Sequence, residues 1–512
     1  MFRNLPGRFL GLRRDMICAS RLFSAAVLIS SFVVAAPACR ADRFTYRDRD
    51  DETQVVEAKL ITTALDTHVV ALPDGEYRLI PKFAVIKHEV EPGPDPMTPA
   101  EAAIHLEDRF GSARFRSYVD DPFVVGLVMS AELPKSSEFR ARNFLRKVAG
   151  FMDKVSGSFK GYLSDLRVPV KEPEYPLVVL IFESDADFDK YMADTTQTEI
   201  IFAKDVAGFY SGLTNYLAIR LRTCSTFEVP LHEAIHQQVY NRNFFQRLAP
   251  IPHWFDEGIA TGFEANGGRI NVGPTKISRR YARQALAGRQ LSWKAMLNDD
   301  KVFQGNVLVG EAYGQAWGLH WLLVTKHRHD YLKYVKLLAQ KQPLEQEPEG
   351  RRDADIRDAF GQDISELQKE FKLQLEVGMM KQKVSLNEPE VAGKSVTDDG
   401  MARVRLTAVT YVDQGGQLEV SGDLTNMCPY RDLAFYVTVE TDSGMYAQWY
   451  LPDVGILKRT PLKRQFVDKI MPGGARSASN EYRVRIRYAP VGSSDAEKWA
   501  AGEFPVPELG QP

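Results

Sequence analysis

Two histidines in the segment STFEVPLHEAIHQQVYNRN, residues 225–243, restrict the fold of this chain more than any other feature. Ser225 and Glu228 form a capping-box pattern, and a proline is tolerated in the first turn of a helix, so a helix is predicted to begin here. His232 and His236 are four residues apart, about one helical turn, so both imidazoles project from the same side of that helix. They can therefore bind one metal ion together.

Glu233 follows the first of these histidines directly. One residue along a helix is a rotation of roughly 100°, so its carboxylate is predicted to lie beside the two imidazoles and outside the set of metal ligands. That is the position of a general base. A catalytic site of this kind needs a third protein ligand and an open fourth position, whereas four protein ligands would make the site structural.

The third ligand is predicted in PHWFDEGIATGFE, residues 252–264. Its large apolar residues fall on one side of a helix that is meant for burial: Trp254, Phe255, Ile259 and Phe263. A buried carboxylate without a partner is costly, so Glu257 needs one, and a metal ion held with the two histidines would supply it.

Two other ligand arrangements are considered. A metzincin would carry glycine and histidine three and six residues after His236, where Val239 and Arg242 stand, so that class is rejected. His253 is the second alternative to Glu257, but it precedes the helical stretch.

The segments HEAIHQ and HWFDEGIATGFE resemble the gluzincin metallopeptidases, which include thermolysin and the zinc aminopeptidases. A poorly characterised bacterial family of exported gluzincin-like domains is more similar still. The matching positions are His232, Glu233, His236, Trp254, Glu257, Gly258 and Ala260. The resemblance covers most of residues 170–380. It implies one Zn²⁺ per chain, held by the two histidines and Glu257, with Glu233 activating water for the hydrolysis of a peptide or protein substrate.

The same resemblance implies two further parts of the site. Residues 207–221 are expected to form an edge strand that binds extended peptide by β-addition. The glycine-x-methionine-glutamate-asparagine signature of the zinc aminopeptidases is absent there, which favours an endopeptidase. Tyr313 is expected to stabilise the oxyanion, with His320 as the alternative, although a histidine in an apolar helix is ordinarily part of the core.

Roles are also considered for four other residues near these motifs. Thr261 and Glu264 are either partners that orient the histidines or surface positions. His327 and His329 lie in a polar KHRHD turn and are expected to be solvated.

The predicted fold is α+β, with a gluzincin-like core between a small N-terminal β-barrel and a C-terminal all-β sandwich. Alternating residues and an Asp74-Gly75 turn indicate the barrel-like unit, and alternating strands separated by expected turns such as Gly415-Gly416 indicate the sandwich. Within the core, the short apolar run PLVVLIFES, bounded by Pro176 and polar residues, is expected to be a buried strand. A helix capped by Asp363 and Glu366 closes the core. The predicted boundaries are a barrel at 43–90, a proline-rich linker at 91–104, the peptidase domain at 105–380, a linker at 381–399 and the sandwich at 400–508.

Residues 1–38 are predicted to be a signal peptide, because basic residues precede an apolar run and a small-residue cleavage site. Translation starts at either Met1 or Met16. The protein is therefore expected outside the cytoplasm, periplasmic or secreted, with lipid attachment at Cys39 as an alternative. Cys224 and Cys428 are too few for a disulfide scaffold and are expected to be buried thiols. No later segment is apolar for long enough to span a membrane.

A net charge of −2 with interspersed basic and acidic residues gives no electrostatic case for binding nucleic acid. Two functions remain as alternatives to a peptidase. One is a cell-envelope binding or scaffold protein that keeps the zinc-bound fold, although such a protein has no need of Glu233. The other is a zinc hydrolase of non-peptide amides.

Overall fold

The computed structural model describes residues 40–92, 95–196, 206–225, 227–265, 269–270, 273–287, 291–303, 309–386, 396–412, 417–441, 446–468 and 482–505. The predicted signal peptide and Cys39 lie outside these residues. Cys39–Pro512 is a single compact unit. None of the helices in the described segments is long and apolar enough to cross a membrane.

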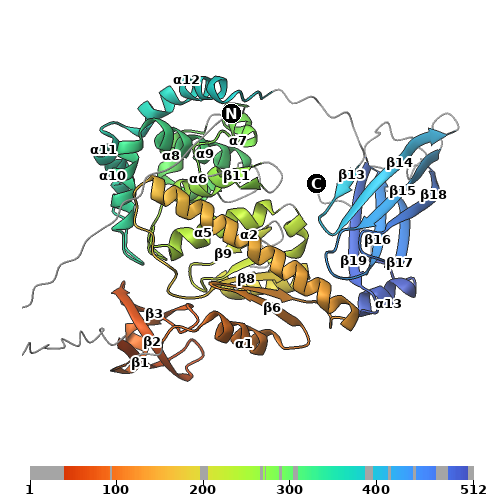
Figure 1. Cartoon of the computed structure of the whole chain (residues 1–512), viewed down its shortest axis with the longest axis horizontal. Helices are drawn as coiled ribbons and strands as arrows, with labels where there is room; N and C mark the ends of the chain where they lie inside the picture. The colour runs from red at the N-terminus through yellow and green to blue at the C-terminus, as the bar shows by residue number, and fades with distance from the viewer. Residues whose placement is uncertain are drawn as a thin grey trace, which may run out of the picture. The chain divides into compact units, whose positions relative to one another are not determined.

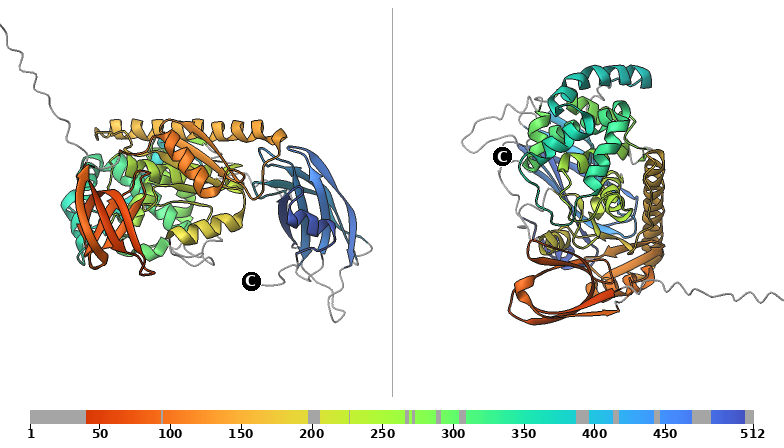
Figure 2. Two further views of the ribbon diagram at one scale, coloured as in Figure 1. Left: turned by 90° about the horizontal axis from the view of Figure 1, so that it is seen from below. Right: turned by 90° about the vertical axis from the view of Figure 1, so that its left-hand side faces the viewer.

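The N-terminal β unit, residues 40–92, is a five-stranded sheet in the order β4-β3-β2-β1-β5, with antiparallel neighbours and strong curvature (Figures 1 and 2). Its strands are β1 (Arg40–Arg47), β2 (Thr53–Ala64), β3 (Thr67–Ala71), β4 (Tyr77–Pro81) and β5 (Val85–Pro92). Phe44, Ala58, Val70 and Ile80 fill its small core. Asp74 and Gly75 form the predicted turn between β3 and β4, and Gly75 has φ +90°, which favours glycine.

The predicted linker at 91–104 is shorter than expected. Helix α1 (Pro99–Phe110) begins inside it, because Thr98 and Glu101 form a complete capping box with Pro99 in the first turn.

The central sheet has the order β6-β7-β8-β10-β9. Its inner strands β7, β8 and β10 are parallel, whereas β6 and β9 are antiparallel to their neighbours. The strands are β6 (Phe115–Asp120), β7 (Phe123–Val128), β8 (Leu177–Phe182), β9 (Gly208–Tyr210) and β10 (Leu217–Arg220). All six residues of β8 are buried, which confirms the strand expected from the apolar run PLVVLIFES.

Helices cover both faces of this sheet. Alternate strand residues such as Val125, Val179 and Ile219 share a core with α2 (Glu138–Asp165) and α5 (Glu228–Asn241), and α2 runs along the sheet in Figures 1 and 2. The intervening residues, such as Val124 and Leu180, pack against α1 and α3 (Asp185–Thr196). The face that carries α5 therefore positions the two histidines.

The expected edge strand at 207–221 is two strands. β9 lies at the sheet edge, and β10 lies inside the sheet between β9 and β8. The segment reverses at the Ser211–Tyr216 turn, where Asn215 has φ 64°. Of these two strands, only β9 lies at an edge of the sheet, and no described strand pairs with its outer side.

The predicted capping box at the start of α5 is wrong. Ser225 ends the 3₁₀ segment Leu221–Ser225, and the residue before α5, Phe227, has a left-handed conformation with φ 57° and no side-chain cap. Helix α5 begins at Glu228, with Pro230 in its first turn as expected.

The remaining helices follow α5 in sequence. They are α6 (His253–Phe263), α7 (Arg279–Ala287), α8 (Trp293–Asn298), α9 (Val309–Lys326), α10 (Arg328–Ala339), α11 (Arg351–Phe360) and α12 (Ile364–Gln382). Asp363 caps α12 as predicted by accepting a hydrogen bond from the Ser365 N–H, but Glu366 pairs with Lys369 in place of closing a capping box.

The C-terminal residues form two antiparallel sheets, in the orders β13-β14-β15-β18 and β17-β16-β19. The strands are β13 (Val396–Asp398), β14 (Ala402–Val412), β15 (Gln417–Asn426), β16 (Leu433–Thr441), β17 (Tyr446–Val454), β18 (Arg459–Asp468) and β19 (Tyr482–Pro490), followed by α13 (Ser494–Ala500). The Gly415-Gly416 turn lies outside the described residues.

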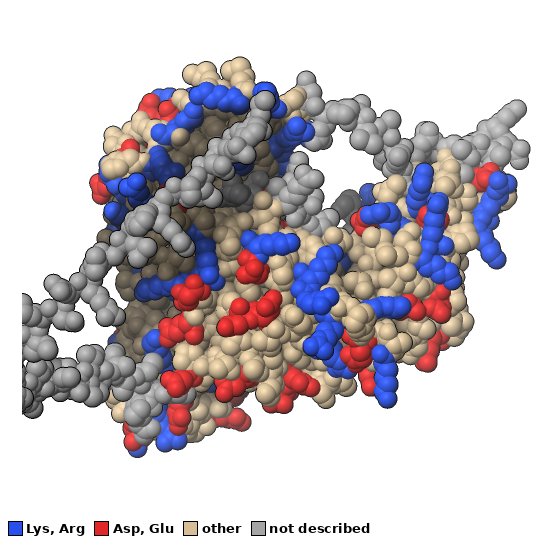
Figure 3. All heavy atoms as spheres, in the orientation of Figure 1, with Lys and Arg blue, Asp and Glu red and all other residues tan. Residues whose placement is uncertain are grey.

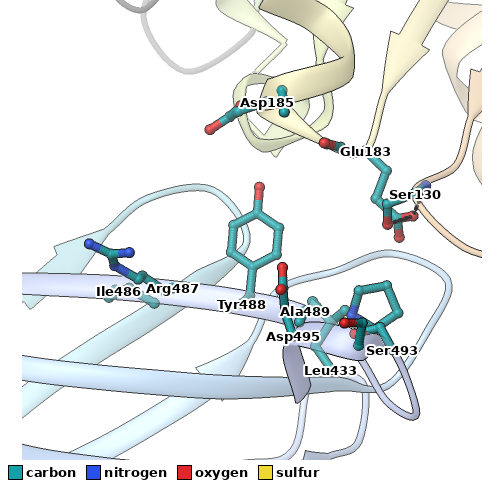
Figure 4. Close-up of a pocket in the computed structure, with 14 residues that line it drawn as sticks. Ser130, Glu183, Asp185, Leu433, Ile486, Arg487, Tyr488, Ala489, Ser493 and Asp495 are labelled. Carbon is teal, nitrogen blue, oxygen red and sulfur yellow. Dashed lines mark hydrogen bonds between the residues drawn. The ribbon is translucent and has the colours of Figure 1, made fainter. Parts of the chain in front are cut away.

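A buried ion pair joins these C-terminal sheets to the central sheet. Arg431 Nε lies 3.0 Å from Glu183 Oε1, with 3% and 2% of the two side chains exposed. Glu183 follows β8, and its other oxygen accepts hydrogen bonds from Ser130 (Figure 4). A pocket of about 490 Å³ lies alongside, lined also by Tyr488 and Asp495.

Cys224 and Cys428 are both buried and free, as expected. On the face seen in Figure 3, basic and acidic side chains lie side by side.

Candidate metal centre

Helices α5 and α6 bring the three predicted ligands together. The ligand atoms of His232, His236 and Glu257 all lie within 4.8 Å of one another. His232 Nε2 is 2.9 Å from Glu257 Oε2 and 3.2 Å from His236 Nε2, and the remaining His236–Glu257 distance is 3.9 Å. The two histidines therefore present the same nitrogen, Nε2, to one point beside the Glu257 carboxylate.

The other nitrogen of each imidazole faces a second carboxylate. His232 Nδ1 lies 2.7 Å from Glu264 Oε1, and His236 Nδ1 lies 3.2 Å from Asp256 Oδ1. Such partners fix the ring orientation and place the proton on Nδ1, which leaves Nε2 free to bind a metal ion.

These carboxylates are fixed in turn by tyrosines. Tyr281 donates a hydrogen bond of 2.7 Å to Glu264, and Tyr240 donates one of 3.0 Å to Asp256. For both Glu264 and Thr261 the sequence left open a role in orienting the histidines or a surface position. Glu264 contacts His232. Thr261 donates to the backbone oxygens of Glu257 and Gly258 inside its own helix.

Asp256 was not among the candidates from sequence. The available signal was a second acidic residue directly before Glu257 in WFDEG. Which histidine it contacts depends on how α5 and α6 cross.

The site carries an excess of negative charge. Burial opposes ionisation of Glu257, but hydrogen bonding to His232 and the charge of His236 lower its pKa to about 2. Burial likewise lowers the pKa of His236, yet Asp256 outweighs it and raises the pKa to about 9. The lowered pKa keeps Glu257 negatively charged, and the raised pKa favours the positively charged form of His236. The cluster therefore pairs its carboxylates with positive charge, which a proton or a metal cation can supply.

Glu233 lies next to the ligand cluster and outside it. Its Oε2 accepts a hydrogen bond of 3.0 Å from the backbone N–H of Tyr210, in edge strand β9. Burial raises the pKa of Glu233 and the two histidines oppose that shift. A raised pKa brings a carboxylate closer to the range in which it exchanges protons at neutral pH.

Tyr313, in α9, reaches the same site. Its ring centroid lies 6.0 Å from that of His232. Burial and the negative charges of Glu257 and Glu233 raise its pKa, so its hydroxyl stays protonated and can donate a hydrogen bond.

Four other histidines considered from sequence are not members of the ligand cluster, although the charge of His253 acts on Glu257. His320 is fully buried and bonds to Tyr331 at 3.2 Å, which confirms the core interpretation. His253 is an exposed residue at the start of α6. His329 is exposed as expected, whereas His327 is half-buried and pairs with Glu370.

Residues 227–345 match the family described as protein of unknown function (DUF1570). This matched segment runs from the residue before α5 to the loop after α10. It contains every side chain of the cluster, its carboxylate partners and Tyr313, whereas β9 and the N-terminal β unit precede it. No curated protein matches the chain.

Proposed function

We propose that this protein is an exported zinc metallopeptidase of gluzincin type, most simply an endopeptidase. In this proposal the gluzincin-like core carries the site, between an N-terminal barrel and a C-terminal sandwich. One observation supports the proposal most directly. Two Nε2 atoms and one ionised carboxylate converge on one point, and Glu233 lies beside them.

The donor set suits zinc. Tetrahedral ligands with zinc bonds of about 2.1 Å lie roughly 3.4 Å from one another. The three distances in this site, 2.9, 3.2 and 3.9 Å, bracket that value. Three protein ligands leave the fourth position for water or substrate, as catalytic zinc sites require.

A zinc ion bound here would polarise the substrate carbonyl and lower the pKa of water from about 15.7 toward about 7. Glu233 takes the proton from the attacking water and returns it to the leaving amine. Tyr313 donates a hydrogen bond to the oxyanion that forms on the former carbonyl. Asp256 and Glu264 hold the imidazoles in the tautomer that binds the metal.

The open edge of β9 supports an extended substrate. It lies directly beside Glu233, and a Cβ on Gly208 would lie 3.0 Å from Val229 and 3.5 Å from Glu233. Because residue 208 is glycine, no side chain from this position lies against Glu233. The absence of an amine-recognition signature in this segment favours cleavage within a chain.

Digestion of a peptide library tests the proposal. The full-length mature protein, loaded with zinc, is expected to cleave internal bonds, and a chelator is expected to abolish the cleavage until zinc is restored. Elemental analysis is expected to give about one zinc per chain, lost in His232→Ala.

Two results point to the alternatives. Zinc binding without cleavage of any peptide or amide would support the scaffold function. Cleavage restricted to non-peptide amides would support the other hydrolase. A protein that binds no zinc after reconstitution would contradict all three.

A further inference from the structure

The general base Glu233 is held by a very short strand. Its partner Tyr210 belongs to β9, which has three residues and pairs only with β10 among the described strands. A strand of this length has few hydrogen bonds of its own, so its position depends on what packs around it.

The turn between β3 and β4 of the N-terminal β unit contacts the loop that follows β9. The Tyr77 N–H donates a hydrogen bond of 2.6 Å to the Leu213 oxygen. Tyr216, at the far end of that loop, donates one of 3.2 Å to Asp74, which is 4% exposed. Tyr77, the first residue of β4, thus binds the middle of the β9–β10 loop, and Asp74 of the turn binds its far end.

Arg247 connects the same turn to the loop between α5 and α6, the two helices that carry the candidate ligands. It lies in the loop between α5 and α6 and is 5% exposed. Its guanidinium donates a hydrogen bond of 2.8 Å to the Gly75 oxygen and lies 3.4 Å from the centroid of the Tyr77 ring. The charge of Arg247 also acts on the Tyr210 hydroxyl.

Tyr210 completes the connection to the metal ligands. Its ring stacks on Tyr240 with centroids 5.7 Å apart, and Tyr240 bonds to Asp256, the partner of His236. Its hydroxyl donates to Asn215, which in turn bonds to Asn241 on α5. The side chain of Tyr210 therefore lies among groups from β4, α5 and the α5–α6 loop, while its N–H holds Glu233.

We propose that Tyr77 and Arg247 are positioning residues for the general base: the N-terminal β unit holds β9 in place through them, and β9 holds Glu233. The proposal rests on the proposed peptidase function for the role of Glu233. The N-terminal β unit is then part of the catalytic scaffold, although it lies outside the segment that matches the DUF1570 family.

Hydrogen exchange in the zinc-loaded full-length protein tests this directly. Tyr77→Ala keeps the backbone hydrogen bond to Leu213 but removes the ring on which Arg247 stacks. It is expected to speed exchange of the Tyr210 amide roughly tenfold or more, because β9 loses this part of its support. Tyr77→Phe keeps the ring against Arg247 and is expected to exchange like wild type. Arg247→Lys keeps the charge but loses the planar stack on Tyr77. Its exchange rate at the Tyr210 amide is expected to lie between those of Tyr77→Ala and wild type. Arg78→Ala is the matched control, since Arg78 is the exposed neighbour that contacts Tyr46 inside the N-terminal β unit.

Kinetics on a cleaved peptide give the second readout. Tyr77→Ala is expected to lower kcat on the order of 10-fold to 100-fold through misplacement of the base, with KM and zinc content nearly unchanged. Loss of zinc together with activity would contradict positioning and indicate general damage to the site.

Exchange at Tyr210 that stays as slow in Tyr77→Ala and Arg247→Lys as in wild type would overturn the proposal. This readout needs no turnover, so it decides the positioning role separately from the proposed function. Failure of that function would appear as a wild-type protein that hydrolyses nothing.

Discussion

His232 is held between two carboxylates, Glu257 at Nε2 and Glu264 at Nδ1, at 2.9 and 2.7 Å. Both carboxylates come from α6 and the residue that follows it, so one helix supplies a ligand and the partner that orients another ligand. Helical spacing is a local property, and it predicted from sequence that His232 and His236 lie on the same side of one helix. The pairing of Glu264 with His232, and of Asp256 with His236, depends on how the two helices cross, which no local pattern fixes.

Glu264→Gln tests the orienting role. It keeps the shape of the side chain but removes the charge that holds the Nδ1 proton of His232, so zinc affinity is expected to fall by about 10-fold to 100-fold. Competition with a chromophoric chelator measures the affinity. Glu366→Gln, on an exposed position of α12, is the control. Equal affinities in the two variants would contradict the role of Glu264.

At the scale of elements, α6 lies unusually close to α9. A Cβ on Gly258 would lie 2.7 Å from the Ala316 oxygen and 2.9 Å from the His320 Cβ. This contact joins the helix that carries Glu257 to the helix that carries Tyr313. The sequence predicted the helix around Gly258 from its apolar pattern, but the helix that packs against it could not be identified because that contact is distant in sequence.

Gly258→Ala is expected to lower the free energy of unfolding by about 1–3 kcal/mol, because backbone at Ala316 cannot move aside as a side chain would. Denaturant unfolding measures the change. Gly157→Ala on α2 is the matched control, since nothing lies within 4 Å of its added Cβ, and it is expected to stabilise by about 0.5–1 kcal/mol. A Gly258→Ala protein as stable as the control would refute the close approach.

The start of α5 shows a further limit of local patterns. Ser225 and Glu228 satisfy the capping-box spacing, yet the chain enters the helix through a left-handed Phe227, which is half-buried and packs against the core. The packing of that ring is a tertiary contact, which the capping-box spacing does not take into account.

At the scale of the whole molecule, the apolar run of β8 predicted a buried strand, and the Asp74-Gly75 turn was also expected. The reversal inside residues 207–221 was not expected, because the segment reads as one continuous strand. In the structure β10 pairs with β8, and the loop before β10 contacts the N-terminal β unit. The ion pair between Arg431 and Glu183 is equally non-local. The two residues are 248 positions apart (431 − 183), which is beyond the reach of any local sequence pattern.

Arg431→Ala is expected to lower the free energy of unfolding by about 3–5 kcal/mol, because it leaves the Glu183 carboxylate buried without its cationic partner. Guanidinium unfolding measures the loss. Arg459→Ala, which removes a 61% exposed partner of Asp423, is the control and is expected to cost about 0–1 kcal/mol. The double variant Arg431→Met, Glu183→Leu is expected to recover much of the stability. A cost for Arg431→Ala no larger than the control would show that the pair does not hold the C-terminal sheets.

The rate of peptide cleavage by zinc-loaded Glu233→Gln tests the central claim most directly. The substitution removes the proton acceptor but leaves every ligand atom in place. The account predicts about one zinc per chain, an unchanged fold, and turnover lower by a factor on the order of 10² to 10⁴. A Glu233→Gln protein that retains zinc and cleaves as fast as wild type would contradict it.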